Sequence, residues 1–415
     1  MPSIAPTLTD DGARRFVEAN SLIASERRRV GVELEWLTVP NADARTPAPF
    51  DVVRSIVAST PLPGGCVPTF EPGGQLELSS PPFADPIAAC DALRTDSAAC
   101  RDALASVGID LVGMGLDPLR AHRRVIDAPR YRAMEAYFDH AGPDGRRMMC
   151  RTAAIQINVE AGSERDADRR WRVAHALGPV LGAAFANSPT AVDLEPGWRS
   201  GRLATWWAMD RSRTWPAVGE GRAIEDWIRY VLAARVMFIR TREERFDPIT
   251  EDLPFARWLA DGHELGWPTE DDLAYHLTTL FPPVRLRGWL ELRMIDSLPD
   301  PWWQVAVAVT TTLLDDPETA ARAERVCTPA ADLWHQAARF GLEHPVLQRA
   351  ADDCFTAVGE ALPRLGINGD TADLIARYHD RYVARGRTPA DDALDHLAAG
   401  RLVRLDEEIP EGSWT

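Results

Sequence analysis

Thr69-Phe-Glu-Pro-Gly-Gly-Gln-Leu-Glu-Leu-Ser-Ser80 is the stretch that decides the fold, because polar and apolar residues alternate along it. Successive side chains of a β-strand point to opposite faces of the sheet. Gln75 and Glu77 are therefore expected on one face and the two leucines on the other. Glu71 keeps the same even spacing. The stretch predicts a half-buried strand with an acidic face.

Three further stretches alternate in the same way and also predict half-buried strands. An ordinary antiparallel sheet with one solvated face would alternate too. Acidic residues are depleted in strands, however, and here they recur. The stretches are Gly31–Trp36, with Glu33 and Glu35; Arg151–Glu160, with Gln156 and Asn158; and Arg285–Met294, with Arg285, Arg287, Glu291 and Arg293.

These acidic faces predict a metal site if they converge. Clustered carboxylates repel one another and raise one another's pKa unless cations lie among them. Hard divalent cations such as Mg²⁺ prefer oxygen ligands. We therefore interpret the shared polar face as a metal-bearing site.

The composition bounds the function. A chain of 415 residues with 45% hydrophobic and 26% charged residues is typical of a globular protein, and its net charge of −16 argues against a nucleic-acid partner. The sequence contains no lysine, so all 46 basic residues are arginine. A P-loop lysine and a Schiff-base lysine are excluded. Any phosphate must be held by metal, arginine or backbone N–H groups.

The cysteines and the first residues indicate the compartment. The six cysteines form no C-x-x-C pair and no zinc-ligand spacing with the nine histidines, which predicts free thiols. The start of the chain lacks a signal-peptide pattern, and no apolar run reaches the length of a membrane span. We expect a cytoplasmic protein without a membrane partner.

In most of the rest of the chain, apolar residues recur with the spacing of helices. The C-terminal part is rich in Ala, Leu, Arg, Asp and Glu and predicts a helical layer over about residues 301–400. We expect a single catalytic domain over residues 1–415, with the sheet core at about 25–300. Helices are expected at 10–24, 51–58, 85–107, 129–140, 166–186, 223–241, 269–279, 301–314, 317–326, 331–341, 344–363, 370–384 and 389–398.

The run Gly197–Arg211 mixes arginines with tryptophans. Arg202 could hold a carboxylate by a bidentate pair against the flat wall of Trp206 and Trp207. A buried tryptophan cluster with solvent-exposed arginines is the alternative.

Five motifs, in order and register over about residues 25–310, resemble the plant-type glutamate-cysteine ligase family. The similarity is greatest to the actinobacterial glutamate-cysteine ligases of ergothioneine biosynthesis. The motifs are Gly31–Glu35, Glu71–Ser79, Arg151–Asn158, Phe185–Pro189 and Leu277–Arg287 with Leu290–Arg293.

The resemblance implies an α+β, glutamine-synthetase-like catalytic fold, in which a curved, mostly antiparallel sheet forms a funnel surrounded by helices. It implies that ATP, L-glutamate and L-cysteine give γ-glutamylcysteine through a γ-glutamyl phosphate, with Mg²⁺ as the metal. Forming an acyl phosphate needs a cation to neutralise the triphosphate, which a carboxylate face could hold.

Site residues follow by matching the motifs. Glu33, Glu35, Glu71, Glu77 and Glu291 resemble metal ligands or their neighbours. Gln156 stands where some relatives carry a histidine ligand. Arg293, with Glu291, is expected to stabilise the transferring phosphoryl group. The residues expected to bind substrate are Arg151, Arg202, Gln156, Asn158, Asn187 and Arg285.

Two other functions stay open at this stage. A related ATP-dependent carboxylate-amine ligase could use another amine, because no motif defines a cysteine pocket. A non-catalytic, metal-binding regulatory relative would be expected to lose acidic ligands, whereas all of them are present. The sequence leaves the oligomeric state and feedback inhibition undetermined.

Overall fold

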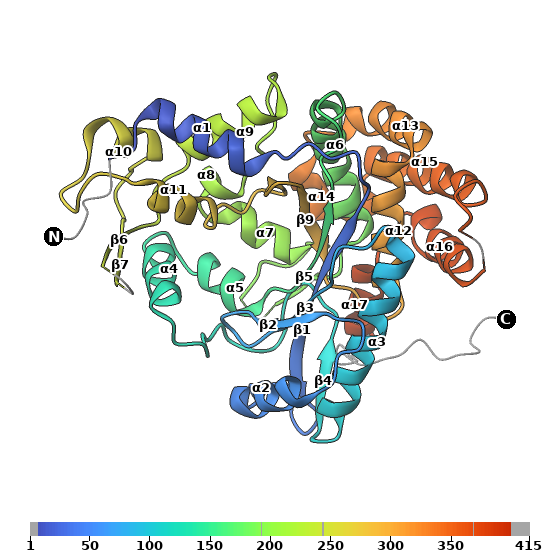
Figure 1. Cartoon of the computed structure of the whole chain (residues 1–415). Helices are drawn as coiled ribbons and strands as arrows, with labels where there is room; N and C mark the ends of the chain where they lie inside the picture. The colour runs from blue at the N-terminus through green and yellow to red at the C-terminus, as the bar shows by residue number, and fades with distance from the viewer. Residues whose placement is uncertain (1–6, 192, 243–244, 368, 400–415) are drawn as a thin grey trace.

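A seven-stranded sheet forms the centre of the computed structural model, which describes residues 7–191, 193–242, 245–367 and 369–399. The strand order is β2-β3-β1-β5-β9-β8, β4 also pairs with β1, and all of these pairs are antiparallel. The sheet is open, with helices around it (Figure 1). The strands are β1 (Val30–Pro40), β2 (Val67–Phe70), β3 (Leu76–Ser79), β4 (Ile109–Val112), β5 (Ala154–Val159), β8 (Val284–Leu286) and β9 (Leu290–Asp296).

One face of the sheet is apolar and covered by helices. Val32, Leu34 and Ile157 alternate with polar residues along β1 and β5 and are almost fully buried. The helices that pack on the sheet are α3 (Pro86–Ala105), α6 (Ala167–Ala184) and α12 (Trp302–Asp315). Because strand side chains alternate, the polar residues point to the other face, as the sequence predicts.

The C-terminal helices gather on one side of the sheet, coloured orange to red in Figure 1. Their apolar residues join the same continuous hydrophobic core as the strands. None of the described helices is long and apolar enough to cross a membrane. This helical layer confirms the prediction; besides α12 it contains α13 (Pro317–Cys327), α14 (Trp334–Phe340), α15 (Pro345–Ala361), α16 (Asp370–Arg381) and α17 (Pro389–Ala398).

A second group of helices lies on the opposite side of the sheet, together with the hairpin of β6 (Phe238–Arg242) and β7 (Arg245–Pro248) (Figure 1). The expected helix at 223–241 is too long: α9 ends at Ala233, and the β-branched and aromatic residues after it enter β6. The group contains α1 (Asp10–Ser21), α4 (Pro129–Asp139), α5 (Asp144–Arg151), α7 (Gly201–Ala208), α8 (Arg211–Thr214), α9 (Ala223–Ala233), α10 (Phe255–Asp261) and α11 (Glu270–Leu277); α2 (Phe50–Ser59) lies near β4.

Two of the four predicted strands are hairpins. Residues 69–80 fold back so that Phe70 pairs with Leu76, and residues 284–292 fold back so that Arg285 pairs with Glu291. Each reversal uses a glycine with positive φ, 91° at Gly74 and 85° at Gly288, a conformation that other residues rarely adopt. The alternation continues through both turns, so the side-chain pattern did not reveal the reversals.

Candidate active site

Three carboxylates meet where β1 lies beside the β2–β3 hairpin. Glu35 is opposite Glu77 in the β1–β3 pair, and Glu71 is in the turn between β2 and β3. Each offers a carboxylate oxygen, and these oxygens lie within 4.8 Å of one another. We call Glu35, Glu71 and Glu77 the carboxylate trio. Oxygen ligands at this spacing suit a hard divalent cation.

Among the described residues, the trio has no direct ion pair, although the charge of the nearby Arg293 partly offsets its negative charge. Burial raises the pKa of Glu71 well above its usual range, and the charges of Glu35 and Glu77 raise it further. Burial also raises the pKa of Glu35 and that of Glu77. Such a group must take up protons or a cation.

Hydrogen bonds orient two members of the trio. Glu35 accepts from the backbone N–H of Ala154 at 2.8 Å and from the Gln156 side-chain amide at 2.9 Å. Glu77 accepts from the hydroxyl of Thr69 on the neighbouring strand at 2.6 Å. The trio is thus held by short strands that are fixed on the core, with lone pairs still available for a ligand.

Glu33 lies beside the trio on the same face of β1. Its carboxylate accepts from the Asn158 side-chain amide at 3.1 Å. Burial raises the pKa of Glu33 to about 7, and the charges of Glu291 and Glu77 contribute. At neutral pH this carboxyl is therefore close to half protonated.

Glu291 has the opposite environment, although it is on the same face. It is fully buried, at 0% exposure, and is paired with three arginines: Arg285 at 2.6 Å, Arg287 at 2.9 Å and Arg293 at 3.0 Å. Burial alone would raise the pKa of Glu291, but the three arginines hold it well below its usual range. We call these four residues the arginine end. Their ion pairs oppose the interpretation of Glu291 as a metal ligand.

Gln156 and Arg293 connect the trio to the arginine end. The Gln156 side chain donates to Glu35 and accepts from the Arg293 guanidinium. Arg293 also lies 5.5 Å from the ring centroid of Trp206, and its Nε is buried without a hydrogen-bond partner. The guanidinium therefore keeps one donor for a ligand near the carboxylates.

Arg202 on α7 is buried and not solvent-exposed, whereas Trp206 and Trp207 are buried, as the alternative of a buried tryptophan cluster expects. It donates to the backbone carbonyl of Arg293 at 2.7 Å, approaches Asp296 at 3.6 Å and stacks on Trp206 at 5.1 Å. Its Nη1 has no hydrogen-bond partner. Burial lowers the pKa of Arg202, and Asp296 and Glu35 oppose this shift. This buried cation is available to an anionic ligand.

Two predicted substrate contacts have protein partners instead. Arg151 pairs with Asp193 at 2.6 Å and donates to the Asp117 carbonyl, so its guanidinium is already used apart from Nε. The Asn187 side chain donates to the backbone carbonyls of Gly113 and Ser297. Their assignment to substrate stays a prediction.

Comparison with known proteins identifies the family of this chain. Residues 29–410 match the model of glutamate-cysteine ligase family 2. The chain belongs to this family. It is 41% identical over 410 residues to glutamate–cysteine ligase EgtA of Mycobacterium tuberculosis (strain H37Rv), with 95% of this chain and 92% of the relative covered. It is 30% identical to the chloroplastic glutamate–cysteine ligase of Arabidopsis thaliana, covering 79% of this chain and 65% of that protein.

Solved structures of ligases share the fold. A glutamate–cysteine ligase from Francisella tularensis in complex with AMP gives a TM-score of 0.54 at 12% identity, covering 92% of this chain and 87% of that one. A bifunctional glutathione synthetase from Pasteurella multocida gives 0.52 at 15% identity, covering 92% and 51%. The predicted α+β, glutamine-synthetase-like fold is confirmed.

The family motifs omit several residues that shape the site. Thr69 and Ser79 donate to Glu77, and Trp206 covers two arginines. Asp296 accepts from the hydroxyls of Ser188 and Ser200 and so anchors the segment before Arg202. Only the β2–β3 pairing brings Thr69 to Glu77, and the stretch was interpreted as one strand.

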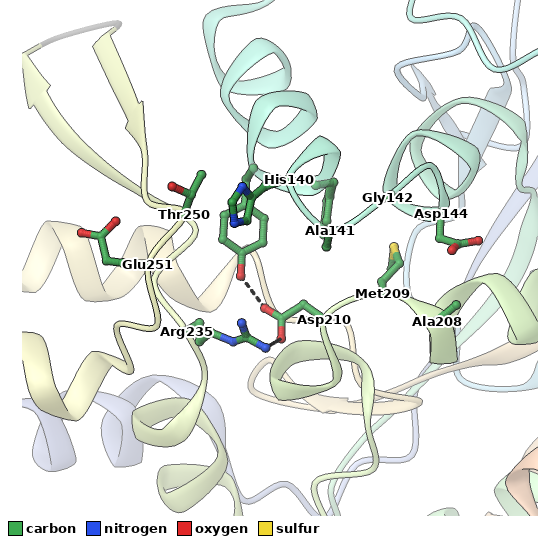
Figure 2. Close-up of a pocket in the computed structure, with 13 residues that line it drawn as sticks. His140, Ala141, Gly142, Asp144, Ala208, Met209, Asp210, Arg235, Thr250 and Glu251 are labelled. Atoms are coloured by element: carbon green, nitrogen blue, oxygen red, sulfur yellow. Dashed lines mark hydrogen bonds and ion pairs between the residues drawn. The ribbon is translucent and has the colours of Figure 1, made fainter.

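A surface pocket lies apart from this site, between the ends of α4 and α7 and the segment after β7 (Figure 2). Its lining includes none of the predicted site residues. Asp210 at its floor accepts from Tyr137 and pairs with Arg235 at 3.3 Å, which satisfies the charges there.

Proposed function

We propose that this chain is an ATP-dependent ligase that joins L-glutamate to L-cysteine through a γ-glutamyl phosphate. The match to glutamate-cysteine ligase family 2 and to EgtA over nearly the whole chain carries the proposal. The geometry supports it, because three clustered carboxylates lie on one sheet face near two arginines, Arg293 on β9 and Arg202 on α7. We further propose that the product serves ergothioneine biosynthesis, since EgtA-type relatives match so extensively.

The carboxylate trio fits a divalent cation, and we propose Mg²⁺ for it. Three oxygens within 4.8 Å of one another, raised pKa values and the lack of an ion pair among the described residues support this choice. When bound, Mg²⁺ neutralises the ATP phosphates. Glu33, which is hydrogen-bonded to Asn158, lies close enough to tune the charge of the site.

The first chemical step transfers a phosphoryl group. A γ-carboxylate oxygen of glutamate attacks the terminal phosphorus of ATP while the bond from that phosphorus to the ADP oxygen breaks. Arg293 is assigned to the transferring group, because its unpartnered Nε can donate to phosphate oxygens. Glu291 orients Arg293 by the ion pair at 3.0 Å and is a positioning residue in this scheme.

The second step forms the amide. The cysteine amine attacks the acyl carbon, the carbon–oxygen bond to phosphate breaks, and phosphate leaves together with one proton from nitrogen.

Arg202 is assigned to a carboxylate of glutamate, because it is buried beside Glu35 and retains a free Nη1. Arg285 acts through Glu291, to which it donates two hydrogen bonds.

An ADP-release assay across pairs of amino acids tests the proposal. Glutamate with cysteine and Mg²⁺ should give the highest rate, and γ-glutamylcysteine should be found by mass spectrometry. Full turnover with aspartate in place of glutamate, or with no amino acid, would reject it. A higher rate with another amine would identify a different ligase of the same family.

Two further properties are proposed on weaker structural grounds. All six cysteines are free and buried, which supports a reducing, cytoplasmic location. One continuous hydrophobic core contains strand residues and C-terminal helix residues alike, which supports a single catalytic domain.

A further inference from the structure

The three arginines of the sheet face share one carboxylate, and the unpartnered Nε of Arg293 is assigned to the transferring phosphoryl group. Arg285, Arg287 and Arg293 all pair with Glu291. The chain has no lysine to add. A bound nucleoside triphosphate carries more negative charge than one divalent cation neutralises, so it requires further cationic groups near the trio.

Arg130 and Arg240 are two such groups. Arg130 on α4 lies 5.0 Å from the ring centroid of Tyr275, and Arg240 on β6 lies 5.3 Å from it. Arg130 also donates to the backbone carbonyl of Thr278 at 3.1 Å. Within the part of the chain that the structure describes, neither arginine has a carboxylate partner. By contrast, Arg132 on the same helix pairs with Asp127 at 2.7 Å.

Backbone hydrogen bonds place the segment before α4 beside the turn that holds Glu71. Val125 and Ile126, just before α4, donate to the carbonyl of Pro72 at 2.8 and 3.3 Å. Pro72 follows Glu71 directly, so α4 begins next to the metal-binding turn. Tyr131, the neighbour of Arg130, has its pKa raised by burial and then by the Glu71 carboxylate. The β6–β7 hairpin packs against α4 (Figure 1), and Arg240 on this hairpin shares the Tyr275 ring with Arg130.

We propose that Arg130 and Arg240 form a clamp for the phosphate tail of ATP, opposite the cation held by the carboxylate trio. This inference rests on the proposed function. The contact with Tyr275 orients the two guanidinium groups, and their N–H donors other than the Arg130 Nη2, which donates to Thr278, are left for phosphate oxygens. The trio and the clamp would then neutralise the triphosphate from two sides, and the clamp would contribute nothing to glutamate binding.

Nucleotide affinity tests the clamp directly. Variants of the full chain are titrated by calorimetry with Mg²⁺ and either β,γ-methylene-ATP or AMP. They are Arg130→Gln, Arg240→Gln, the double variant, and Arg132→Gln as a control. Each single clamp variant should lose about tenfold, and the double variant about a hundredfold, in affinity for the triphosphate analogue. Affinity for AMP, the KM for glutamate and the Arg132→Gln control should not change.

Other results overturn the inference. Equal losses for AMP and for the analogue would mean that the arginines support the fold or the nucleoside, and a loss no larger than in Arg132→Gln would mean that they only cover Tyr275. Arg130→Lys and Arg240→Lys, which keep the charge, should retain affinity between that of wild type and that of the Gln variants. If the wild-type chain fails to bind the analogue, the proposed ligase function fails; if it binds and ligates while the Gln variants behave normally, only the clamp fails.

Discussion

The carboxylate trio and the arginine end both contain buried glutamates, yet the charges around these glutamates are opposite. Glu71 has neighbours of like charge, and its pKa is raised well above the usual range. Glu291 has three arginines around it, and its pKa is lowered. Gln156 lies between them, joined to Glu35 on one side and to Arg293 on the other.

The difference separates two tasks for a glutamate in an active site. A carboxylate without a cationic partner destabilises the folded, metal-free chain, and a bound cation stabilises the folded state. A carboxylate with three partners is already satisfied and holds the arginines in place. The first kind binds a cofactor, whereas the second kind positions the groups that meet the substrate.

Glu291→Gln should therefore destabilise the protein. The substitution leaves three arginines, two of them largely buried, without their shared counter-charge. Removing one partner of a buried ion pair costs about 3–5 kcal/mol. Chemical denaturation of the metal-free protein measures the loss. Glu160→Gln, which breaks the single ion pair with Arg29, is the matched control and should cost at most about 1 kcal/mol.

Glu77→Gln should act in the opposite sense. It removes one negative charge from the trio while keeping the shape, so the metal-free thermal midpoint should be unchanged or higher. The ligation rate should fall by about a hundredfold or more, as expected for losing a group that helps to place transition-state charge. The stabilisation by Mg²⁺-ATP, read from the shift in midpoint, should shrink.

These two variants can break the comparison. If Glu77→Gln unfolds readily without metal and ligates normally, the trio serves the fold. If Glu291→Gln keeps its stability but loses metal-dependent stabilisation, Glu291 is a metal ligand after all. Glu160→Gln again serves as the control, because Glu160 is outside both groups and its loss should leave the rate unchanged.

The sequence predicted the faces of the sheet better than its connections. Alternation placed Glu33, Glu35 and Glu77 on one face because side-chain direction in a strand depends only on the local period of two. It did not distinguish one long strand from a hairpin, since the reversals at Gly74 and Gly288 preserve that period. The helical C-terminal layer was predictable from local periodicity alone.

The ion pairs could not be predicted from the sequence for a different reason. Nothing in the Leu290–Arg293 motif says that Glu291 meets Arg285 and Arg287, because that contact depends on the β8–β9 turn. The partners of Arg202 likewise come from segments about 90 residues away, and only packing brings them together.

Raising the pH should lower the stability of the metal-free protein but not that of the metal-bound protein. The pKa of Glu33 is raised from 4.5 to about 7 in the folded chain, so between these values the folded state holds a proton that the unfolded state has lost. Stability from this group is present below pH 4.5 and is lost as the pH rises to about 7, by about 1–3 kcal/mol. Thermal midpoints across this range, with and without Mg²⁺, measure it. A cation favours the charged form and should flatten the curve, whereas Glu33→Gln should remove only the part due to Glu33, because the pKa values of the trio are raised as well. A midpoint that rises with pH would contradict the assignment.

The smallest expected effect concerns Arg202, which lies between the two regions through its contacts with Arg293 and Asp296. Lysine keeps the charge but cannot donate to the Arg293 carbonyl and to a carboxylate ligand in one fixed plane. Arg202→Lys should therefore raise the KM for glutamate about tenfold, because roughly one charge-assisted hydrogen bond is lost. The KM for ATP should change little. A substrate-free thermal midpoint near that of wild type would show that the packing on Trp206 tolerates the change. If the midpoint falls while glutamate affinity stays the same, Arg202 belongs with Glu291 as a support of the sheet, and the substrate carboxylate must be held elsewhere.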